Sequence, residues 1–381
     1  MKGEGTLAKS GGYIPTLDGW RACAILAVIF SHASTSASGL EKLPHWLLWV
    51  KVGCGEKGVQ LFFAISGFLI TSRLIEEWNC FGRISLKRFY VRRVCRILPP
   101  AMTYLLFIGL LGLIGVLSLE WRYWLSAVCF YRNNMPLGGA AFDAHYWSLS
   151  IEEQFYLIWP ALLVLSGLSR SKYTASILIF AIWCWRWIAY HHVFGLTRGV
   201  QNWWRSDICF DGLLVGCLFA LALESATVKK WLTKCLTVWV VAAIVVIILA
   251  TGGHTNTPSG RTIQSLLMPF LIVATILNPR TWLGLLLEVP VIRWIGRLSY
   301  SLYIWQQLFA FQRMLPWYPL QLVALFGMAA LSFYAIEKPM IRLGYRLAPP
   351  PSLGHNDLGA VRSLSGDIPA SERVESKELV S

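Results

Sequence analysis

The chain has 381 residues, of which 56% are hydrophobic and only 14% are charged, with 19 Trp and a mean hydropathy of +0.54. Soluble domains contain fewer apolar residues, so this composition excludes an ordinary soluble protein and predicts a polytopic membrane protein. The net charge of +14 would fit nucleic acid binding, but the basic residues are concentrated in particular loops, which gives the charge another origin.

Stretches with few charges recur at lengths near the ~20 residues that cross a bilayer. Ten spans are predicted, at residues 17–37, 58–75, 101–118, 147–166, 175–194, 207–224, 235–251, 262–278, 297–314 and 319–336. The connections are too short for an appended soluble domain, so residues 1–348 are expected to form one all-α transmembrane helix bundle. Residues 349–381 are polar and rich in Ser, Pro and Gly, which predicts a disordered cytoplasmic tail.

The basic residues favour one side of the membrane. With a cytoplasmic N-terminus, that side collects 20 Lys and Arg, whereas the opposite side collects 9. This asymmetry follows the positive-inside rule and predicts that both termini are cytoplasmic. It explains the net charge without a nucleic acid partner, and the lipid bilayer is the expected surrounding.

The first span, "LDGWRACAILAVIFSH", carries two costly polar groups, Arg21 and His32. Eleven residues rotate a helix by about 1100°, so both side chains share one face and lie ~16 Å apart along the axis. The predicted orientation puts Arg21 near the cytoplasmic surface and His32 deeper in the membrane. Ionisable groups in spans suggest function, although Arg21 snorkelling to the interface and His32 bonding a neighbouring helix is an alternative.

The second span, "GVQLFFAISGFLITSR", contains small residues that permit close helix packing, with Gly58 and Gly67 as the sites of approach and Ser66 as a small polar contact. Packing is the favoured interpretation of this stretch.

The next segment, "RISLKRFYVRRVCRILPP", places Arg88, Arg92 and Arg96 on one stripe of a helix, with Arg93 beside it. Guanidinium groups suit phosphate oxygens, so the cluster is predicted to clamp phosphate or to anchor the cytoplasmic side, and both roles are compatible. The pair Pro99–Pro100 is expected to end the segment.

The strongest local signal is "HYWSLSIEEQFYLIWP". Ser148 and Glu152 lie at i and i+4 and are expected to sit together in the outer half of the span, whereas Glu153 faces another side. A carboxylate at that depth can orient a histidine and raise its basicity, as a general base requires. The alternative is an interfacial carboxylate that faces water.

Two later stretches add polar groups. In "RSDICFDGLLVG", Asp207 and Asp211 share a face, Arg205 is placed to pair with an acid, and Gly212 and Gly216 permit tight packing. In "GRLSYSLYIWQQ", the side chains along one face are Tyr300, Tyr303 and Gln306.

Several common motifs are absent. There is no GxSxG, HExxH, GxxxxGK[ST] or CxxC, so a hydrolase triad, a zinc site and a nucleotide-driven pump are not indicated. No metal and no tightly bound cofactor are expected. The other histidines, His145 and His191 among them, fall in or near predicted outer loops, where they are expected to be solvated or interfacial.

Taken in order, these blocks resemble the acyltransferase-3 family of integral-membrane acyltransferases, which O-acylate sugars and other acceptors. Arg21 and His32 match its first motif, an Arg or Lys followed by ten residues and a His. The similarity covers about residues 13–340. Where many members have a His in the ninth span, this chain has Gln306.

The resemblance implies a cytoplasmic acyl-CoA donor, usually acetyl-CoA, and transfer to an envelope glycan or lipid-linked sugar, in a bacterial inner membrane. His32 is predicted to be the general base, with Glu152 orienting it and Asp207 shaping the acceptor side. The donor is expected to contact Arg21, Arg88, Arg92, Arg93 and Arg96. Substrate contacts are predicted for Ser148, Arg205 and Tyr300. A transporter or flippase with a buried charged site is the alternative function, and a purely structural membrane partner leaves the carboxylates unexplained.

Overall fold

The computed structural model describes residues 13–32, 45–136, 141–191, 204–251, 257–311 and 318–349. All regular secondary structure in these ranges is helical, which confirms the all-α prediction. The predicted tail from residue 350 onward lies outside them. In chain order the helices are α1 Pro15–His32, α3 His45–Phe81, α4 Leu86–Leu113, α5 Trp121–Val128, η2 Arg132–Asn134, η3 Ala141–Asp143, α6 Tyr146–Ser166, α7 Leu168–Tyr190, α8 Ser206–Ala222, α9 Ala226–Cys235, α10 Val238–Ala250, α11 Pro258–Leu277, α12 Trp282–Leu287, α13 Pro290–Gln306, η6 Gln307–Phe311, α14 Tyr318–Ser332, η7 Phe333–Glu337 and α15 Lys338–Leu347.

Apolar helices of membrane-spanning length occur in the described part of the chain. Four of them are long and apolar enough to cross a bilayer, at Gly53–Phe81, Leu86–Leu113, Pro258–Leu277 and Pro319–Leu347. A fifth span is possible if α8 and α9, which meet at a bend of 112°, are counted together. The protein is therefore an integral membrane protein. Each of the ten sequence-predicted spans also overlaps one of the longer helices or helix pairs.

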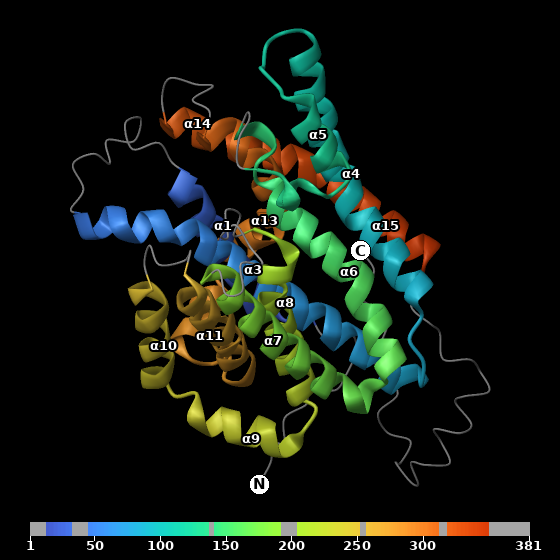
Figure 1. The fold of residues 1–381 in the computed structure, drawn as a ribbon, viewed down its shortest axis with the longest axis vertical. Helices are drawn as coiled ribbons and strands as arrows, with labels where there is room; N and C mark the ends of the chain where they lie inside the picture. Colours follow the sequence, from blue (N-terminus) through green and yellow to red (C-terminus); the bar gives the residue numbers. More distant parts are fainter. Residues whose placement is uncertain are drawn as a thin grey trace, which may run out of the picture.

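Helix α3 lies at the centre of the bundle and packs against α1 and α8 (Figure 1). The backbones of α3 and α8 approach very closely because glycines face the partner helix. A Cβ atom added at Gly67 would lie 1.9 Å from the carbonyl oxygen of Leu213, and one at Gly216 would lie 2.3 Å from that of Ala64. The predicted role of these small residues in helix packing is thus confirmed.

Two further contacts place the helices that carry the candidate site. Helix α1 packs along α13, and α4 lies beside α15, as Figure 1 shows. Helix α9 runs across the lower ends of α8 and α10 in the same view. Residues from α1, α3, α4, α6 and α13 can therefore meet in the interior.

The prediction that Pro99–Pro100 ends the arginine-rich segment is wrong, because α4 continues through both prolines to Leu113. Side chains bond the carbonyl groups of this stretch. Tyr300 donates a hydrogen bond of 2.7 Å to Ile97 O, and Thr103 donates one of 2.8 Å to Pro99 O. These bonds lie beside the carbonyls of Cys95 and Arg96, which the two prolines leave without an amide donor, in a helix that neighbouring helices support.

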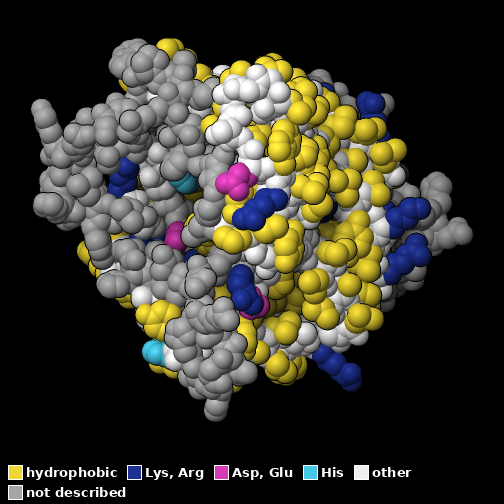
Figure 2. Space-filling model, turned by 45° about the horizontal axis from the view of Figure 1, so that its top comes forward, with side chains coloured by type: hydrophobic (Ala, Val, Ile, Leu, Met, Phe, Trp, Pro, Cys, Tyr) yellow, Lys and Arg dark blue, Asp and Glu magenta, His cyan; other side chains and the backbone are white. Residues whose placement is uncertain are grey.

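The surface is largely apolar where the described residues cover it. Figure 2 shows a broad hydrophobic area with Lys and Arg mainly at its margins. Large apolar side chains such as Leu165 and Trp239 are 83% and 81% exposed. Soluble monomers rarely expose contiguous apolar areas of this kind, so this face is suited to lipid.

The α3–α8 crossing gives a stability test. Gly67→Ala should lower the free energy of unfolding by about 1–3 kcal/mol, because the two helices must separate to admit the methyl group. Gly327→Ala in α14 is the matched control, since a Cβ there meets no atom within 4 Å. Thermal unfolding of both purified variants in detergent measures the difference, and equal midpoints would contradict the close packing.

Candidate active site

An interior cavity of about 90 Å³ lies between α1, α3, α4, α6 and α13. Its wall combines basic, acidic and hydroxyl side chains with aromatic rings. The polar members are Arg21, Ser66, Arg93, Arg96, Ser148, Glu152, Tyr156, Arg297, Ser299, Tyr300 and Tyr303. Six sequence-predicted site residues are therefore brought together here: Arg21, Arg93, Arg96, Ser148, Glu152 and Tyr300.

Four arginines from three helices form the basic part of the wall: Arg21, Arg93, Arg96 and Arg297. Arg21 of α1 lies 3.6 Å from Asp18 of the same helix. Arg93 lies over the rings of Phe89 and Tyr156, at 5.6 and 5.1 Å from their centroids. In the described part of the chain, no carboxylate forms an ion pair with Arg93 or Arg96. The cavity thus carries positive charge that an anion can compensate.

Glu152 lies opposite these arginines and is held by two hydroxyl groups. Ser66 of α3 donates a hydrogen bond of 3.1 Å to one carboxylate oxygen, and Tyr156, one turn further along α6, donates one of 3.1 Å to the other. Ser148 and Glu152 share the cavity, as their i, i+4 spacing predicts. Because both oxygens are bonded by these hydroxyls, Glu152 is fixed in place within the cavity wall.

The backbone holds the ring of His32, whereas Ser66 and Tyr156 bond Glu152, whose role toward His32 stays a prediction. The ring nitrogen Nδ1 lies 3.0 Å from the carbonyl oxygen of Val28 and must donate to it. This places the proton on Nδ1 and the lone pair on Nε2. His32 is the last described residue of α1 and lies beyond the cavity wall, where the side chain of Gln306 approaches it.

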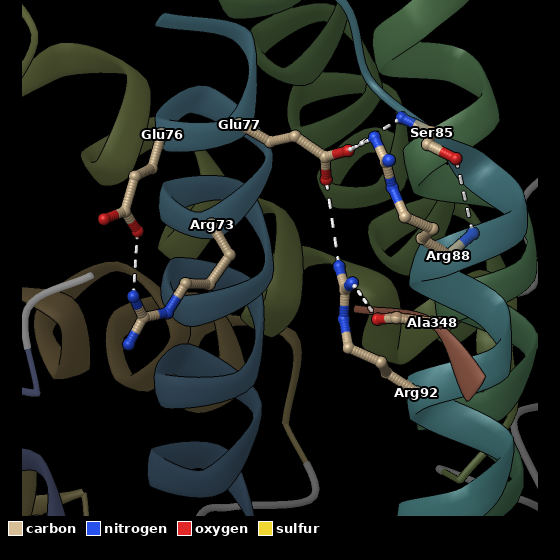
Figure 3. A network of polar contacts seen from close by, with 7 residues as sticks. All are labelled: Arg73, Glu76, Glu77, Ser85, Arg88, Arg92 and Ala348. Carbon is tan, nitrogen blue, oxygen red and sulfur yellow. Dashed lines mark hydrogen bonds and ion pairs between the residues drawn. The ribbon is translucent and has the colours of Figure 1, made fainter. Parts of the chain in front are cut away.

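The other two arginines of the predicted clamp are structural. Figure 3 shows Arg88 and Arg92 turned toward Glu77 at the end of α3, with Glu77 oxygens 3.1 and 3.8 Å from their guanidinium nitrogens. Arg92 also donates a hydrogen bond of 3.1 Å to Ala348 O, next to α15. Neither residue lines the cavity, because their guanidinium groups are directed to Glu77 and, for Arg92, to Ala348. Their predicted donor contact is therefore not supported.

Hydroxyl groups link the cavity to the start of α6. The hydroxyls of Ser148 and Tyr303 are hydrogen-bonded to each other, and Tyr303 donates to His145 O at 3.0 Å. The side chain of His145 is only 4% exposed and lies among the rings of Tyr104, Tyr146 and Tyr303. The expectation of a solvated His145 is wrong, since the η3 segment and α13 bury it. It also lies within electrostatic range of His32.

The sequence matches a known protein family over most of its length. The family model described as "Acyltransferase domain" (Acyl_transf_3) matches residues 14–338. The chain belongs to this acyltransferase family. The match includes every element that lines the cavity, so the arginine-lined cavity and His32 lie within the acyltransferase domain.

The acyltransferase is similar to several named proteins. A Staphylococcus aureus (strain COL) protein named "Putative O-acetyltransferase" is 29% identical over 329 residues, which cover 79% of this chain and 51% of the relative. The "Peptidoglycan O-acetyltransferase OatA" of Listeria monocytogenes is 28% identical over 373 residues, or 89% of this chain and 58% of the relative. The chain thus spans little more than half the length of these relatives. No solved structure matches the chain.

Asp207 and Arg205, predicted near the acceptor, lie away from the cavity. Both nitrogens of the Arg205 fork contact the Asp207 carboxylate, at 3.0 and 2.8 Å, and the pair is partly exposed. Asp211, one turn on, is instead fully buried against Arg186 of α7 and accepts a 2.7 Å hydrogen bond from Ser265 of α11. The face of α8 that carries Asp207 and Asp211 therefore packs against α7, and Asp211 also links it to α11.

Sequence reasoning missed several polar residues at the site of this acyltransferase. Tyr156 follows Glu152 by four residues, a spacing that would have predicted their contact. Glu337 gave no such signal. It is 2% exposed at the end of η7 and accepts a 2.8 Å hydrogen bond from Ser301 of α13. His145 was misplaced because its burial depends on segments that are distant in sequence.

The two aspartates of α8 give a matched pair of variants. Asp211→Asn should lower the free energy of unfolding by about 3–5 kcal/mol, because it leaves the buried charge of Arg186 uncompensated. Asp207→Asn should cost about 0–1 kcal/mol, since its ion pair is partly exposed. Thermal unfolding of the purified proteins tests this order, and equal losses would contradict the assigned burial.

Proposed function

We propose that this acyltransferase transfers an acyl group, with acetyl as the leading candidate, from acyl-CoA to a hydroxyl of an envelope glycan or lipid-linked sugar. The observation that carries the proposal is the cavity in which Arg21, Arg93 and Arg96 converge on the helix that bears His32. The names of the relatives, which specify O-acetyl transfer and in one case peptidoglycan, support the chemistry.

The donor is proposed to bind with its phosphates toward the arginines. Acyl-CoA carries phosphates at one end and a thioester at the other, and guanidinium forks match phosphate oxygens. The cavity has room for several water-sized groups. That is enough for part of the CoA arm, so the nucleotide remains at the mouth, where Arg297 is exposed, and the thioester must extend toward His32 beyond the cavity wall.

His32 is proposed to act as the general base. Its Nε2 removes the proton of the acceptor hydroxyl while the oxygen attacks the thioester carbonyl. The C–O bond forms, the C–S bond breaks, and the protonated ring then returns the proton to the departing thiolate. The Val28 carbonyl holds the tautomer that this step requires.

Glu152 is proposed to position the donor side of the cavity. Its hydrogen bonds to Ser66 and Tyr156 tie α3 to α6 beside the arginines. Asp207 lies outside the cavity wall, so the proposal gives it no part in the reaction.

The proposed membrane topology has ten spans with both termini in the cytoplasm of a bacterial inner membrane. The asymmetry of Lys and Arg between the two sides supports it, as does the overlap of each predicted span with a long helix or helix pair. A reporter that works only in the cytoplasm should be active when it is fused after Arg346. Activity of an alkaline phosphatase fusion at the same site would overturn the orientation.

Substitutions in the two pairs of arginines on α4, Arg93 with Arg96 and Arg88 with Arg92, should affect donor binding differently. Arg93→Gln should weaken acetyl-CoA binding by roughly 10- to 100-fold, because a charge-assisted contact in a buried site is lost. Arg88→Gln is the control, since Arg88 is paired with Glu77 away from the cavity. Calorimetry with purified protein measures both affinities. Equal weakening would mean that the stripe acts through structure alone.

The catalytic role of His32 predicts a loss of turnover without a loss of donor binding. His32→Ala should reduce acetyl transfer by roughly 10²–10⁴-fold, the usual contribution of a positioned acid–base group. Its acetyl-CoA affinity should stay close to that of the parent protein. Incorporation of radiolabelled acetyl groups into envelope glycans is the measurement, with the exposed His191→Ala as control. Transfer at the parent rate by the His32 variant would remove this histidine from the mechanism. Absence of transfer by the parent protein would favour a transporter.

A further inference from the structure

Among the described residues, buried polar atoms that make no hydrogen bond of good geometry gather at the end of α13. They are both ring nitrogens of His145, the indole Nε1 of Trp305, the amide oxygen and nitrogen of Gln306, and the amide oxygen of Gln307. The exposed fractions of these side chains are 4%, 3%, 0% and 3%. We call these four residues the outer polar cluster.

Two of these side chains meet a common ring, and the other two follow directly along the same helix end. The ring of Tyr104 is 5.4 Å from that of His145 and 5.2 Å from that of Trp305, so one tyrosine contacts both. The ring of His145 also approaches the main chain at Ile304. The chain changes to a π-helix at Gln307, where α13 would otherwise continue, and such segments are frequent at functional sites.

The concentration of these atoms needs a physical cause. Buried polar groups in proteins are almost always paired, and each exception points to strain, to a chemical role or to a ligand or water. Scattered exceptions are ordinary, but this cluster holds several on one helix end and the facing start of α6. The groups include both donors and acceptors, as a hydroxyl compound requires, and carry no fixed charge.

The position of the cluster relates it to the proposed reaction. His145 lies within electrostatic range of His32, and Gln306 approaches the His32 ring. Ser148 and Tyr303, which are hydrogen-bonded to each other, stand between the arginine-lined cavity and the main chain of His145. The donor cavity and the outer polar cluster therefore meet near His32 from different sides.

We infer that the outer polar cluster is the acceptor pocket of this enzyme, and that His145 binds the hydroxyl-bearing acceptor. The inference rests on the proposed acyl transfer and adds where the sugar binds. Aromatic rings with a few placed polar groups are typical of small-molecule sites, and Tyr104, Tyr146 and Trp305 supply such walls here. Acceptor hydroxyls would pair the orphaned atoms of His145 and Gln306 and reach Nε2 of His32.

Thiol labelling tests the pocket independently of catalysis. His145→Cys and Gln306→Cys are placed in a background that keeps only the buried Cys209 and Cys217. A small, charged methanethiosulfonate should label both in detergent-purified protein. Ser150→Cys is the matched control, because Ser150 is fully buried one turn along α6 and bonds Tyr146 O within its own helix. A saturating peptidoglycan-derived tetrasaccharide should slow labelling at position 145. Labelling no faster than at position 150, or unaffected by the sugar, would overturn the inference.

Steady-state kinetics test the role of His145 in binding. With acetyl-CoA and the same tetrasaccharide, His145→Phe should raise the acceptor KM by roughly 10- to 100-fold, since buried hydrogen bonds to the sugar are lost. The KM for acetyl-CoA should change less than about twofold, and His145→Gln should restore part of the acceptor affinity because it keeps hydrogen-bonding groups. Ser150→Ala should behave as the parent.

The two failures are distinguishable. No acetyl transfer by the parent protein would contradict the proposed function, and the labelling result would still decide whether the cluster is an open, sugar-binding pocket. Transfer by the parent together with an unchanged acceptor KM in His145→Phe would contradict the acceptor pocket alone. An equal rise of both KM values would assign His145 a structural role and also overturn the inference.

Discussion

Charged groups held away from water need opposite charges or hydrogen bonds beside them, and this requirement governs the interior of the bundle. Asp211 is matched by Arg186 between α7 and α8, and Glu77 is matched by Arg88 and Arg92 between α3 and α4. Each of these pairs joins two helices. The ion pairs therefore select which helices meet, while the small residues on α3 and α8 set how closely they meet.

The same requirement makes the cavity distinctive. Arg93 and Arg96 lie on the same helix as Arg88 and Arg92, yet only the latter pair forms ion pairs with a carboxylate among the described residues. Arg93 lies beside the stripe of Arg88 and Arg92, whereas Arg96 shares that stripe but lies one turn further along α4, where it lines the cavity and forms no ion pair with Glu77. Positive charge left at the cavity is then available to a ligand, and phosphate is the group that arginine recognises best.

Local spacing in the sequence predicted the parts of this arrangement that lie within one helix. The shared face of Ser148 and Glu152 and the close approach through Gly67 and Gly216 follow from a 3.6-residue period and from the absence of a Cβ atom. Local spacing could not predict the contacts between different helices. Helical spacing separates Arg93 from Arg92, but it does not show which of the two meets the cavity, because Tyr156, Glu77 and Ala348 are distant in sequence.

The backbone orientation of His32 suits a base that must release its proton again. A carboxylate partner would add negative charge and stabilise the protonated ring. The neutral carbonyl of Val28 fixes the same tautomer without that charge. In the proposed mechanism, the ring accepts the hydroxyl proton as attack develops and returns it to the thiolate when the C–S bond breaks.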